Sequence, residues 1–257
     1  MDVFTFVILL GTGIAGGVMA ALVGGASVIT FPVLLWAGLS PVAATASNLV
    51  AVSGGNFLAA MTNRDHLPPL NRAFVGQVVA SLLGALLGAV LLLATPVRMF
   101  EQLIPLLLGF ATILFAFADP ITQWMRARAK ARGRDGWRMS VTSMPLILPI
   151  SVYGGYFGAG AGTLLLGALT LATGGDYRRA NVAKNLVSSL NTVAASVGFV
   201  VNGAISWPHT LAMMVGCLIG GFCGAHLSRH VPQEFMRWVV IAVGVLLTVV
   251  FAWKYWF

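Results

Sequence analysis

A short polar motif occurs twice in this 257-residue chain and holds the residues best suited to bind a polar solute. Residues 43–50 read Ala-Ala-Thr-Ala-Ser-Asn-Leu-Val, and residues 180–187 read Ala-Asn-Val-Ala-Lys-Asn-Leu-Val. The shared residues Asn48 and Asn185 carry amides that can replace part of the hydration shell of a solute. An asparagine that bonds the backbone of a neighbouring helix would explain the same pattern. We predict a polar site between the two motifs, with helix packing as the alternative.

The second copy of the motif adds a positive charge, because Lys184 stands where the first copy has Ser47. A lysine inside an apolar span is rare and often marks a substrate pathway. Lys184 would attract an anion, or it would extend its ammonium group to the membrane surface beside Arg178 and Arg179. Ser188 and Asn191 lie four and seven residues after Lys184, which puts all three on one helical face. The side-chain candidates are therefore Ser47, Asn48, Lys184, Asn185, Ser188 and Asn191.

Glycines form a second group of candidates because they interrupt the apolar pattern just before a short segment in each half. Gly24 and Gly25 precede one short segment, and Gly160 and Gly162 mark the other. Helix continuity is costly at glycine. A helix that begins at such a break presents N–H groups and the positive end of its dipole to an anion. We expect these four glycines to shape the substrate site. Other glycines are expected only to allow close helix packing, namely Gly84, Gly88, Gly220 and Gly224.

The composition indicates an integral membrane protein. Hydrophobic residues make up 58% of the chain and charged residues only 9%, which excludes an ordinary soluble domain. Much of the positive charge lies in one polar stretch at 119–139, which favours a cytoplasmic loop over a nucleic-acid surface. The two cysteines lie six residues apart in an apolar run, at 217 and 223. No disulfide framework, metal site, cofactor or enzyme activity is therefore predicted.

The acidic residues favour an anionic or neutral substrate because none lies centrally in an expected span. Four sit near the ends of spans and three lie outside them: Glu101, Asp119, Asp176 and Glu234, then Asp2, Asp65 and Asp135. A pathway for cations usually needs carboxylates that offset desolvation.

Hydropathy and breaker residues divide the chain into two blocks of five apolar segments. The segments are expected at 3–23, 26–38, 41–61, 71–94 and 98–118, and at 140–159, 162–173, 179–202, 206–228 and 234–256. The second segment of each block has about 12 residues, too few to cross a hydrocarbon core about 30 Å thick. Each first pair is expected to form a broken helix or a re-entrant hairpin. We predict a membrane repeat at 1–118, a basic cytoplasmic linker at 119–139 and a second repeat at 140–257.

The two blocks align with each other along nearly their whole length. An offset of 137 residues places Gly17 on Gly154, and later an offset of 136 places Gly84 on Gly220. Internal repeats with short, interrupted segments are typical of secondary transporters. The basic residues fit the positive-inside rule best if each hairpin enters and leaves on one face. We therefore predict an all-α membrane protein of two inverted-topology repeats, each a broken helix pair plus three transmembrane helices, with both termini outside.

The first interruption resembles a known family. Residues 24–35 read Gly-Gly-Ala-Ser-Val-Ile-Thr-Phe-Pro-Val-Leu-Leu, followed by Gly-Leu-Ser-Pro at 38–41 and an Ala/Thr/Ser-rich helix. This arrangement is similar to the sulfite exporter TauE/SafE family of bacterial permeases. The resemblance implies a plasma-membrane transporter of sulfur-containing oxyanions such as sulfite or organosulfonates. A transporter built from repeats works by rocking or gating around a site between them.

Two alternatives to sulfur-oxyanion transport remain. One is a transporter of the same fold for another small anion or a neutral metabolite. The other is a membrane assembly or scaffold protein, in which buried polar groups only hold helices together. The expected partners are a small anion and the lipid bilayer, and the oligomeric state is not predicted.

Overall fold

The computed structural model describes residues 1–22, 24–67, 72–117, 120, 123, 124, 127, 144–173, 176–227 and 233–256, and these are almost entirely helical. The first half contains α1 (Val3–Leu22), α2 (Ala26–Trp36), α3 (Pro41–Thr62), the short 3-10 helix η1 (Arg64–His66), α4 (Arg72–Ala94) and α5 (Val97–Ala116). The second half contains α7 (Met144–Tyr156), α8 (Ala161–Ala172), α9 (Tyr177–Val201), α10 (Trp207–Leu227) and α11 (Gln233–Trp256). The expected segments therefore appear in the expected order. Most of the predicted linker at 119–139 lies outside the described residues.

Six helices in the described part of the chain are long and apolar enough to cross a membrane: α1, α3, α4, α5, α10 and α11. By contrast, α2 has 11 residues and α8 has 12, so at 1.5 Å per residue neither can span the hydrocarbon core. With 25 residues α9 is long enough, but it is less apolar because it carries Arg178, Arg179 and Lys184. The chain is a multi-pass membrane protein.

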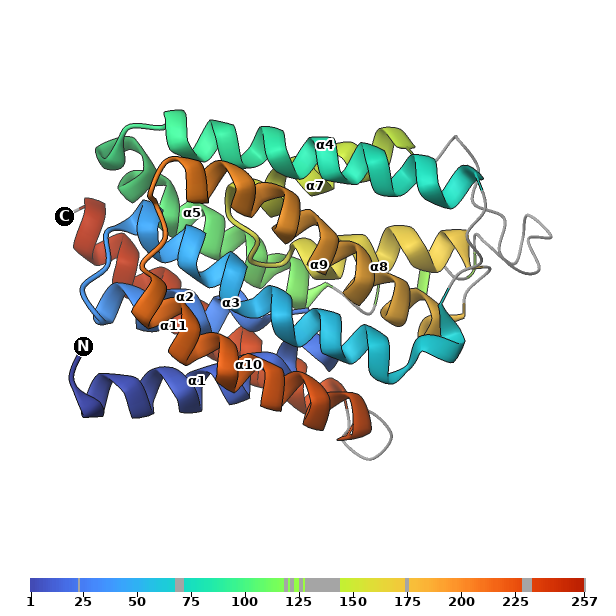
Figure 1. Ribbon diagram of the computed structural model, residues 1–257, viewed down its shortest axis with the longest axis horizontal. Helices are drawn as coiled ribbons and strands as arrows, with labels where there is room; N and C mark the ends of the chain where they lie inside the picture. The colour runs from blue at the N-terminus through green and yellow to red at the C-terminus, as the bar shows by residue number, and fades with distance from the viewer. Residues whose placement is uncertain are drawn as a thin grey trace.

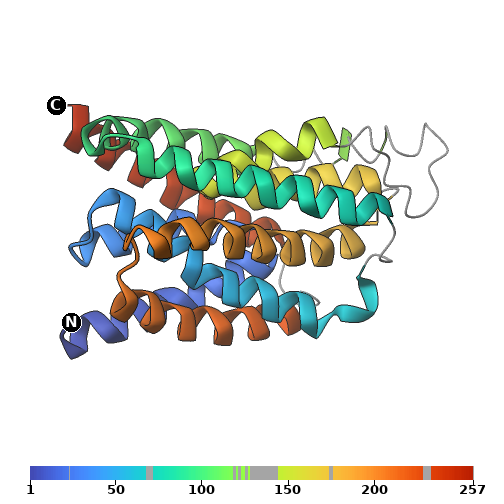
Figure 2. The same cartoon turned by 45° about the horizontal axis from the view of Figure 1, so that its top comes forward.

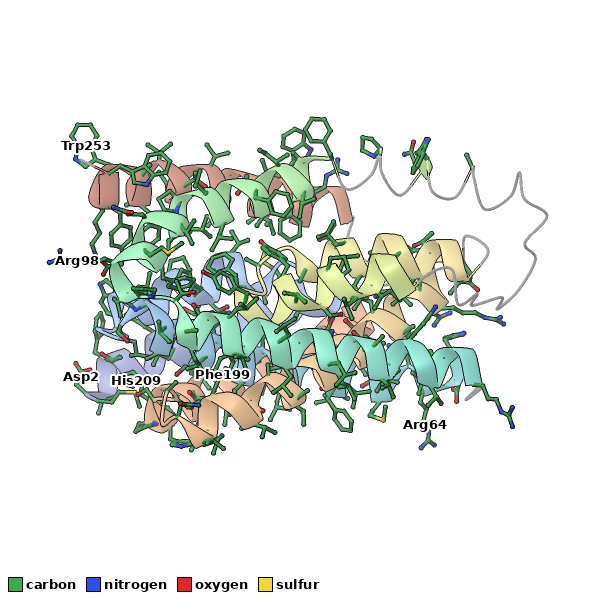
Figure 3. The ribbon with its side chains drawn as sticks, turned by 90° about the horizontal axis from the view of Figure 1, so that it is seen from above. Asp2, Arg64, Arg98, Phe199, His209 and Trp253 are labelled. Carbon is green, nitrogen blue, oxygen red and sulfur yellow. The ribbon has the colours of Figure 1, made fainter. Side chains whose placement is uncertain are left out.

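The helices run along one common direction, and both termini lie at the same end of the molecule (Figures 1 and 2). Helix α2 runs back toward the end at which α1 begins, and α8 runs back toward the end at which α7 begins (Figure 1). Asp2, Arg98, His209 and Trp253 lie toward the end with the termini, whereas Arg64 lies toward the opposite end (Figure 3). The two short helices therefore extend in opposite directions from the middle of the bundle.

Glycines let two pairs of helices approach closely. A Cβ atom added to Gly88 on α4 would lie 2.0 Å from the carbonyl oxygen of Val152 on α7. A Cβ atom added to Gly220 on α10 would lie 2.1 Å from the carbonyl oxygen of Ile14 on α1. Contacts this short leave no room for any side chain, so the packing role expected for these glycines is confirmed.

We expect Gly88→Ala to destabilise the protein by about 1–3 kcal/mol, because the added methyl group overpacks the α4–α7 contact. Thermal unfolding of the detergent-solubilised protein measures the change. The matched control is Gly11→Ala on α1, where an added Cβ atom would meet nothing within 4 Å. Equal unfolding temperatures for the two variants would contradict the close packing of these helices.

Aromatic contacts in the core join the two halves near the middle of the bundle. The ring of Phe31 on α2 lies edge-on to that of Phe157, which directly follows α7, with 5.2 Å between ring centroids. Phe100 on α5 lies 6.3 Å from Phe157 by the same measure, and all three rings are fully buried. The first short helix therefore packs on the interruption that precedes the second one.

Candidate functional site

The two helix interruptions touch each other. A Cβ atom added to Gly24 would lie 3.1 Å from the carbonyl carbon of Gly162, and one added to Gly162 would lie 3.1 Å from Gly24 Cα. Gly24, Gly158 and Gly160 have φ angles of 81°, 82° and 78°, a region that residues with side chains rarely adopt. Both breaks therefore depend on glycine, and their backbones meet between the halves of the molecule.

Both short helices begin at this junction without a side-chain cap. Gly25 precedes α2 and Gly160 precedes α8, and at neither helix start does a capping side chain accept a hydrogen bond from the backbone N–H groups. The N–H group of Gly162 donates to no other residue that the structure describes. Because α2 and α8 point away from each other (Figure 1), the positive ends of both helix dipoles face the junction. Such helix ends favour a negative charge.

A cavity lies at the junction, between both interruptions and helices α3, α7 and α9. Its water-accessible volume of about 60 Å³ is several times the roughly 10–15 Å³ that one water molecule requires. The polar side chains along its wall are Ser27, Asn56, Lys184, Ser188, Asn191 and Thr192. No carboxylate is present among the described wall residues. Hydroxyl, amide and ammonium donors at this size suit a small anion or a neutral polar solute.

Lys184 is the one charged side chain among the described residues of the cavity wall. It is 0% exposed, and its ammonium group donates to the carbonyl oxygen of Ala20 at 2.9 Å. The Lys184 side chain therefore does not reach the membrane surface, and the snorkelling alternative is wrong. No ion pair of Lys184 with a carboxylate is found among the described residues, whereas Arg179 pairs with Asp176. An ammonium group carries three donors, and Ala20 accepts from only one of them.

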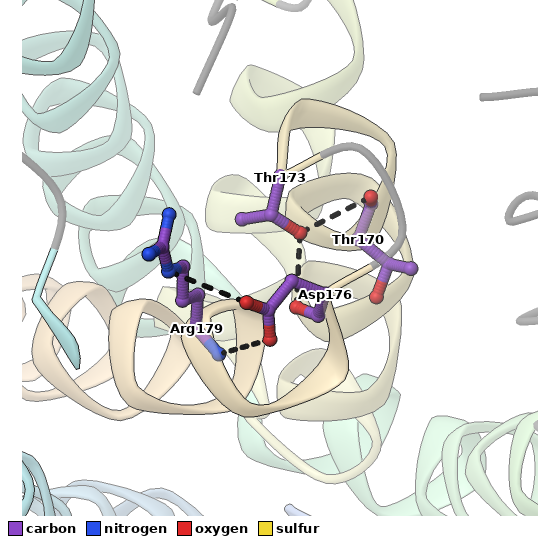
Figure 4. Close-up of polar contacts among 4 residues, drawn as sticks. All are labelled: Thr170, Thr173, Asp176 and Arg179. Carbon is purple, nitrogen blue, oxygen red and sulfur yellow. Dashed lines mark hydrogen bonds and ion pairs between the residues drawn. The ribbon is translucent and has the colours of Figure 1, made fainter. Parts of the chain in front are cut away.

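The turn between α8 and α9 fixes where α9 begins (Figure 4). Asp176 caps α9, because its Oδ1 accepts from the Arg179 amide at 3.1 Å and its Oδ2 pairs with Arg179 Nε at 3.3 Å. The hydroxyl of Thr173 donates to the carbonyl oxygens of Asp176 and Thr170, at 3.0 and 3.2 Å. This cap sets the start of α9. It therefore also sets the position of Lys184 along the bundle.

One face of α9 is bonded to the end of α1. The donors are Tyr177 Oη, Asn181 Nδ2 and Lys184 Nζ, and the acceptors are the carbonyl oxygens of Leu22, Ala21 and Ala20, at 3.1, 3.0 and 2.9 Å respectively. Carbonyl groups in the last turn of a helix lack partners within the helix, so these contacts satisfy three of them. Neither Tyr177 nor Asn181 was expected from the sequence, although their spacing of four and then three residues to Lys184 is helical.

Five of the ten residues predicted from the sequence line the cavity: Gly24, Gly162, Lys184, Ser188 and Asn191. Gly25 and Gly160 directly precede the two short helices. The cavity wall also contains Ser27 and Thr192, which were not predicted from the sequence. Thr192 could have been found, because it lies four residues after Ser188 on the same face of α9.

The other three predicted residues are buried but are not among the described wall residues: Ser47, Asn48 and Asn185. The side-chain oxygen of Asn48 accepts from the hydroxyl of Thr30 on α2, so this asparagine joins α3 to α2. The hydroxyl of Ser47 accepts from the backbone amide of Ser206 at 3.0 Å. Asn185 is 2% exposed. For Asn48 and Ser47 the observed contacts favour helix packing, and their role in the site stays a prediction.

A polar cavity between the two halves of a multi-pass helical protein is typical of membrane transporters. The family described as "Sulfite exporter TauE/SafE" matches residues 9–251. The chain therefore belongs to the TauE/SafE family, as its first interruption indicates, and it is a transporter and not an enzyme.

Similar proteins from several bacteria carry the same general description. A "Probable membrane transporter protein" of Haemophilus influenzae is 24% identical over 94% of this chain and 92% of its own length. The "Probable membrane transporter protein YfcA" of Escherichia coli is 22% identical over 94% of this chain and 87% of its own length. The "Probable membrane transporter protein YunE" of Bacillus subtilis is 22% identical over 93% of this chain and 96% of its own length. No solved structure matches the chain.

Proposed function

We propose that this protein carries a small sulfur oxyanion, such as sulfite or an organosulfonate, across the bacterial inner membrane by alternating access around the central cavity. The observation that carries the proposal is the buried Lys184 in a cavity at which α2 and α8 both begin. The family description supplies the sulfur chemistry. The cavity supplies a reason for selecting an anion.

The electrostatics of the cavity favour one small anion. The N-terminus of a helix acts as roughly half a positive charge, and two such ends lie beside the Lys184 ammonium group. A buried ammonium group without a counter-charge is costly. An anion that enters the cavity pairs with Lys184 and offsets the desolvation of both charges. The Gly162 N–H group and the hydroxyl of Ser188 are then available to the oxygens of the anion.

Helix packing supports the proposed internal repeat, and the opposite directions of α2 and α8 support its inversion (Figure 1). Helix α1 packs along α10 and α4 packs along α7, while α3 packs on α9 and α5 packs on α11. Under the sequence alignment of the halves, α1 corresponds to α7, α4 to α10, α3 to α9 and α5 to α11. If the two halves are exchanged, the α1–α10 pair therefore becomes the α7–α4 pair. The α3–α9 and α5–α11 pairs stay the same. A pseudo-twofold axis between the halves has this property.

The described basic residues support a cytoplasmic orientation for the end that carries Arg64 (Figure 3). Residues near this end, by the direction of their helices, are Arg64, Arg72, Arg178, Arg179 and Arg237. The opposite end carries Arg98 and Lys254. Cytoplasmic ends of membrane helices are rich in arginine and lysine. In this orientation both termini lie outside the cytoplasm.

We expect a C-terminal alkaline phosphatase fusion to be active, because this enzyme folds only outside the cytoplasm. A C-terminal fluorescent reporter that matures only in the cytoplasm is expected to stay dark. The same reporters inserted after residue 66 serve as the control and should give the reverse result. A bright C-terminal fluorescent fusion would contradict the proposed orientation.

Transport is tested with purified protein in proteoliposomes. Uptake of sulfite and sulfoacetate is compared with uptake of carboxylates of similar size, and protein-free vesicles give the background. We expect flux of the sulfur oxyanions well above background. Flux of carboxylates alone would favour the transporter of another anion, and no flux of any solute would favour the scaffold alternative.

A further inference from the structure

Four buried polar side chains lead away from the cavity between helices α4, α7 and α9. The Asn191 amide, which lines the cavity, donates to Ser151 Oγ at 3.3 Å, and Ser151 Oγ lies 2.6 Å from Ser81 Oγ. Gln77 lies one helical turn before Ser81 on α4. We call this set the polar branch: Gln77, Ser81, Ser151 and Asn191. Their exposed fractions are only 3%, 0%, 1% and 8% respectively.

The polar branch has hydrogen-bonding capacity that the described protein does not use. Both the oxygen and the nitrogen of the Gln77 amide are buried without a partner, and so is the side-chain oxygen of Asn191. Buried polar groups are nearly always bonded to protein, water or a ligand. The branch therefore holds donors and acceptors that a bound ligand could use.

The repeat-related positions on α10, α1 and α3 show that the fold does not require these polar groups. At offsets of 136 and 137 residues, the positions that correspond to the polar branch hold Met213, Cys217, Ile14 and Gly54. The alignment agrees with the packing, because a Cβ atom on Gly84 would meet Ser151 and one on Gly220 would meet Ile14. The contact of α10 with α1 and α3 is thus built from residues without amide or hydroxyl groups, whereas the corresponding contact of α4 with α7 and α9 is built from polar ones. A purely structural role does not account for this difference.

We propose that the polar branch binds a sodium ion that is carried together with the anion. This inference rests on the proposed function, because it assigns the coupling ion of the same transport cycle. Amide and hydroxyl oxygens are hard ligands of the kind that small hard cations prefer. None of the four side chains titrates near neutral pH, so the branch offers nothing to which a proton would bind. The polar branch has no carboxylate to balance the charge of the sodium ion, and the anion in the adjoining cavity supplies this negative charge.

Lys184 makes the binding of the two ions interdependent. It shares the cavity wall with Asn191, and their separation of seven positions corresponds to a rise of about 10 Å along α9. The ammonium group therefore repels a sodium ion in the empty protein and repels it less once an anion is bound. By linkage, each ion then raises the affinity for the other by the same factor.

The test measures sulfite binding to the purified full-length protein by calorimetry in sodium, potassium or choline chloride at equal ionic strength. We expect the sulfite affinity to be at least about tenfold higher in sodium, within the usual range of coupling between sites. Sodium without sulfite is expected to leave the unfolding temperature nearly unchanged. This comparison uses the unaltered protein and so does not depend on whether any variant folds.

Two substitutions import the corresponding residues of α10, namely Gln77→Met and Ser81→Cys. Both are expected to abolish the sodium effect while they keep the affinity for sulfite seen in choline. Ser196→Ala, on α9 but outside the cavity wall, is the matched control and should retain the effect. Equal sulfite affinity in all three salts would overturn the sodium site and leave the proposed function intact. No sulfite binding in any salt would overturn the proposed function and the sodium site with it.

Discussion

Lys184→Met is expected to lower the affinity for sulfite by at least about 100-fold, because removal of one partner of a buried ion pair costs about 3–5 kcal/mol. Methionine nearly matches the length of the lysine side chain but has no charge and no N–H donor. The cavity therefore keeps its shape and loses its cation. The hydrogen bond to Ala20 is lost as well, but Tyr177 and Asn181 still join α9 to α1.

Calorimetry and proteoliposome flux measure the effect of Lys184→Met. The matched control is Lys254→Met, because Lys254 lies in the last turn of α11 and is exposed. Unfolding temperatures of both variants show whether the fold is kept. A folded Lys184→Met protein with unchanged sulfite affinity would remove the lysine from the site.

Gly24→Ala is expected to reduce flux at least about tenfold, which corresponds to about 1.4 kcal/mol. Two effects combine at this position. An alanine at a φ of 81° is strained, and its Cβ atom would press on the backbone of Gly162 at 3.1 Å. The strain alone costs about 1–2 kcal/mol of stability. The contact between the two interruptions changes in addition, and with it the position of the helix ends that face the anion.

Gly38→Ala separates these two effects. Gly38 has a φ of 91°, so alanine is strained there too, but an added Cβ atom would meet nothing within 4 Å. We expect similar losses of thermal stability in the two variants and a loss of flux only for Gly24→Ala. Equal flux in both variants would show that the contact between Gly24 and Gly162 is not needed for transport.

The helical segments could be predicted from the sequence because their signals are local. Runs of apolar residues end at Gly, Pro and charged residues, and the ends of α2 and α8 follow these breakers closely. From the sequence, the glycines of both interruptions were expected to shape one substrate site. The sequence could not show that Gly24 and Gly162 touch, because that contact depends on how the halves pack.

The choice of site residues was harder for a physical reason. The repeat marks Asn48 and Asn185 equally, yet a residue lines a cavity only if its helix is rotated the right way. On α9 the row formed by Lys184, Ser188 and Asn191 faces the cavity. Asn48 instead bonds Thr30 on α2. Helix rotation depends on tertiary packing, which the motif alone does not encode.

The contacts that anchor α9 could not be predicted because their acceptors are backbone carbonyl groups. Tyr177 and Asn181 bond the last turn of α1, more than 150 residues earlier in the chain. Every residue has a carbonyl oxygen, so the sequence carries no signal for this partner. The polar branch was hidden for a similar reason, since its members lie on three helices that only the fold brings together.

An experimental structure at saturating sulfite tests most directly whether the central cavity is the anion site. We expect density for one anion in the cavity, with oxygens within hydrogen-bonding distance of Lys184 Nζ and the Gly162 N–H group. An anion bound elsewhere in a transport-competent protein, with the cavity filled by side chains, would contradict this assignment.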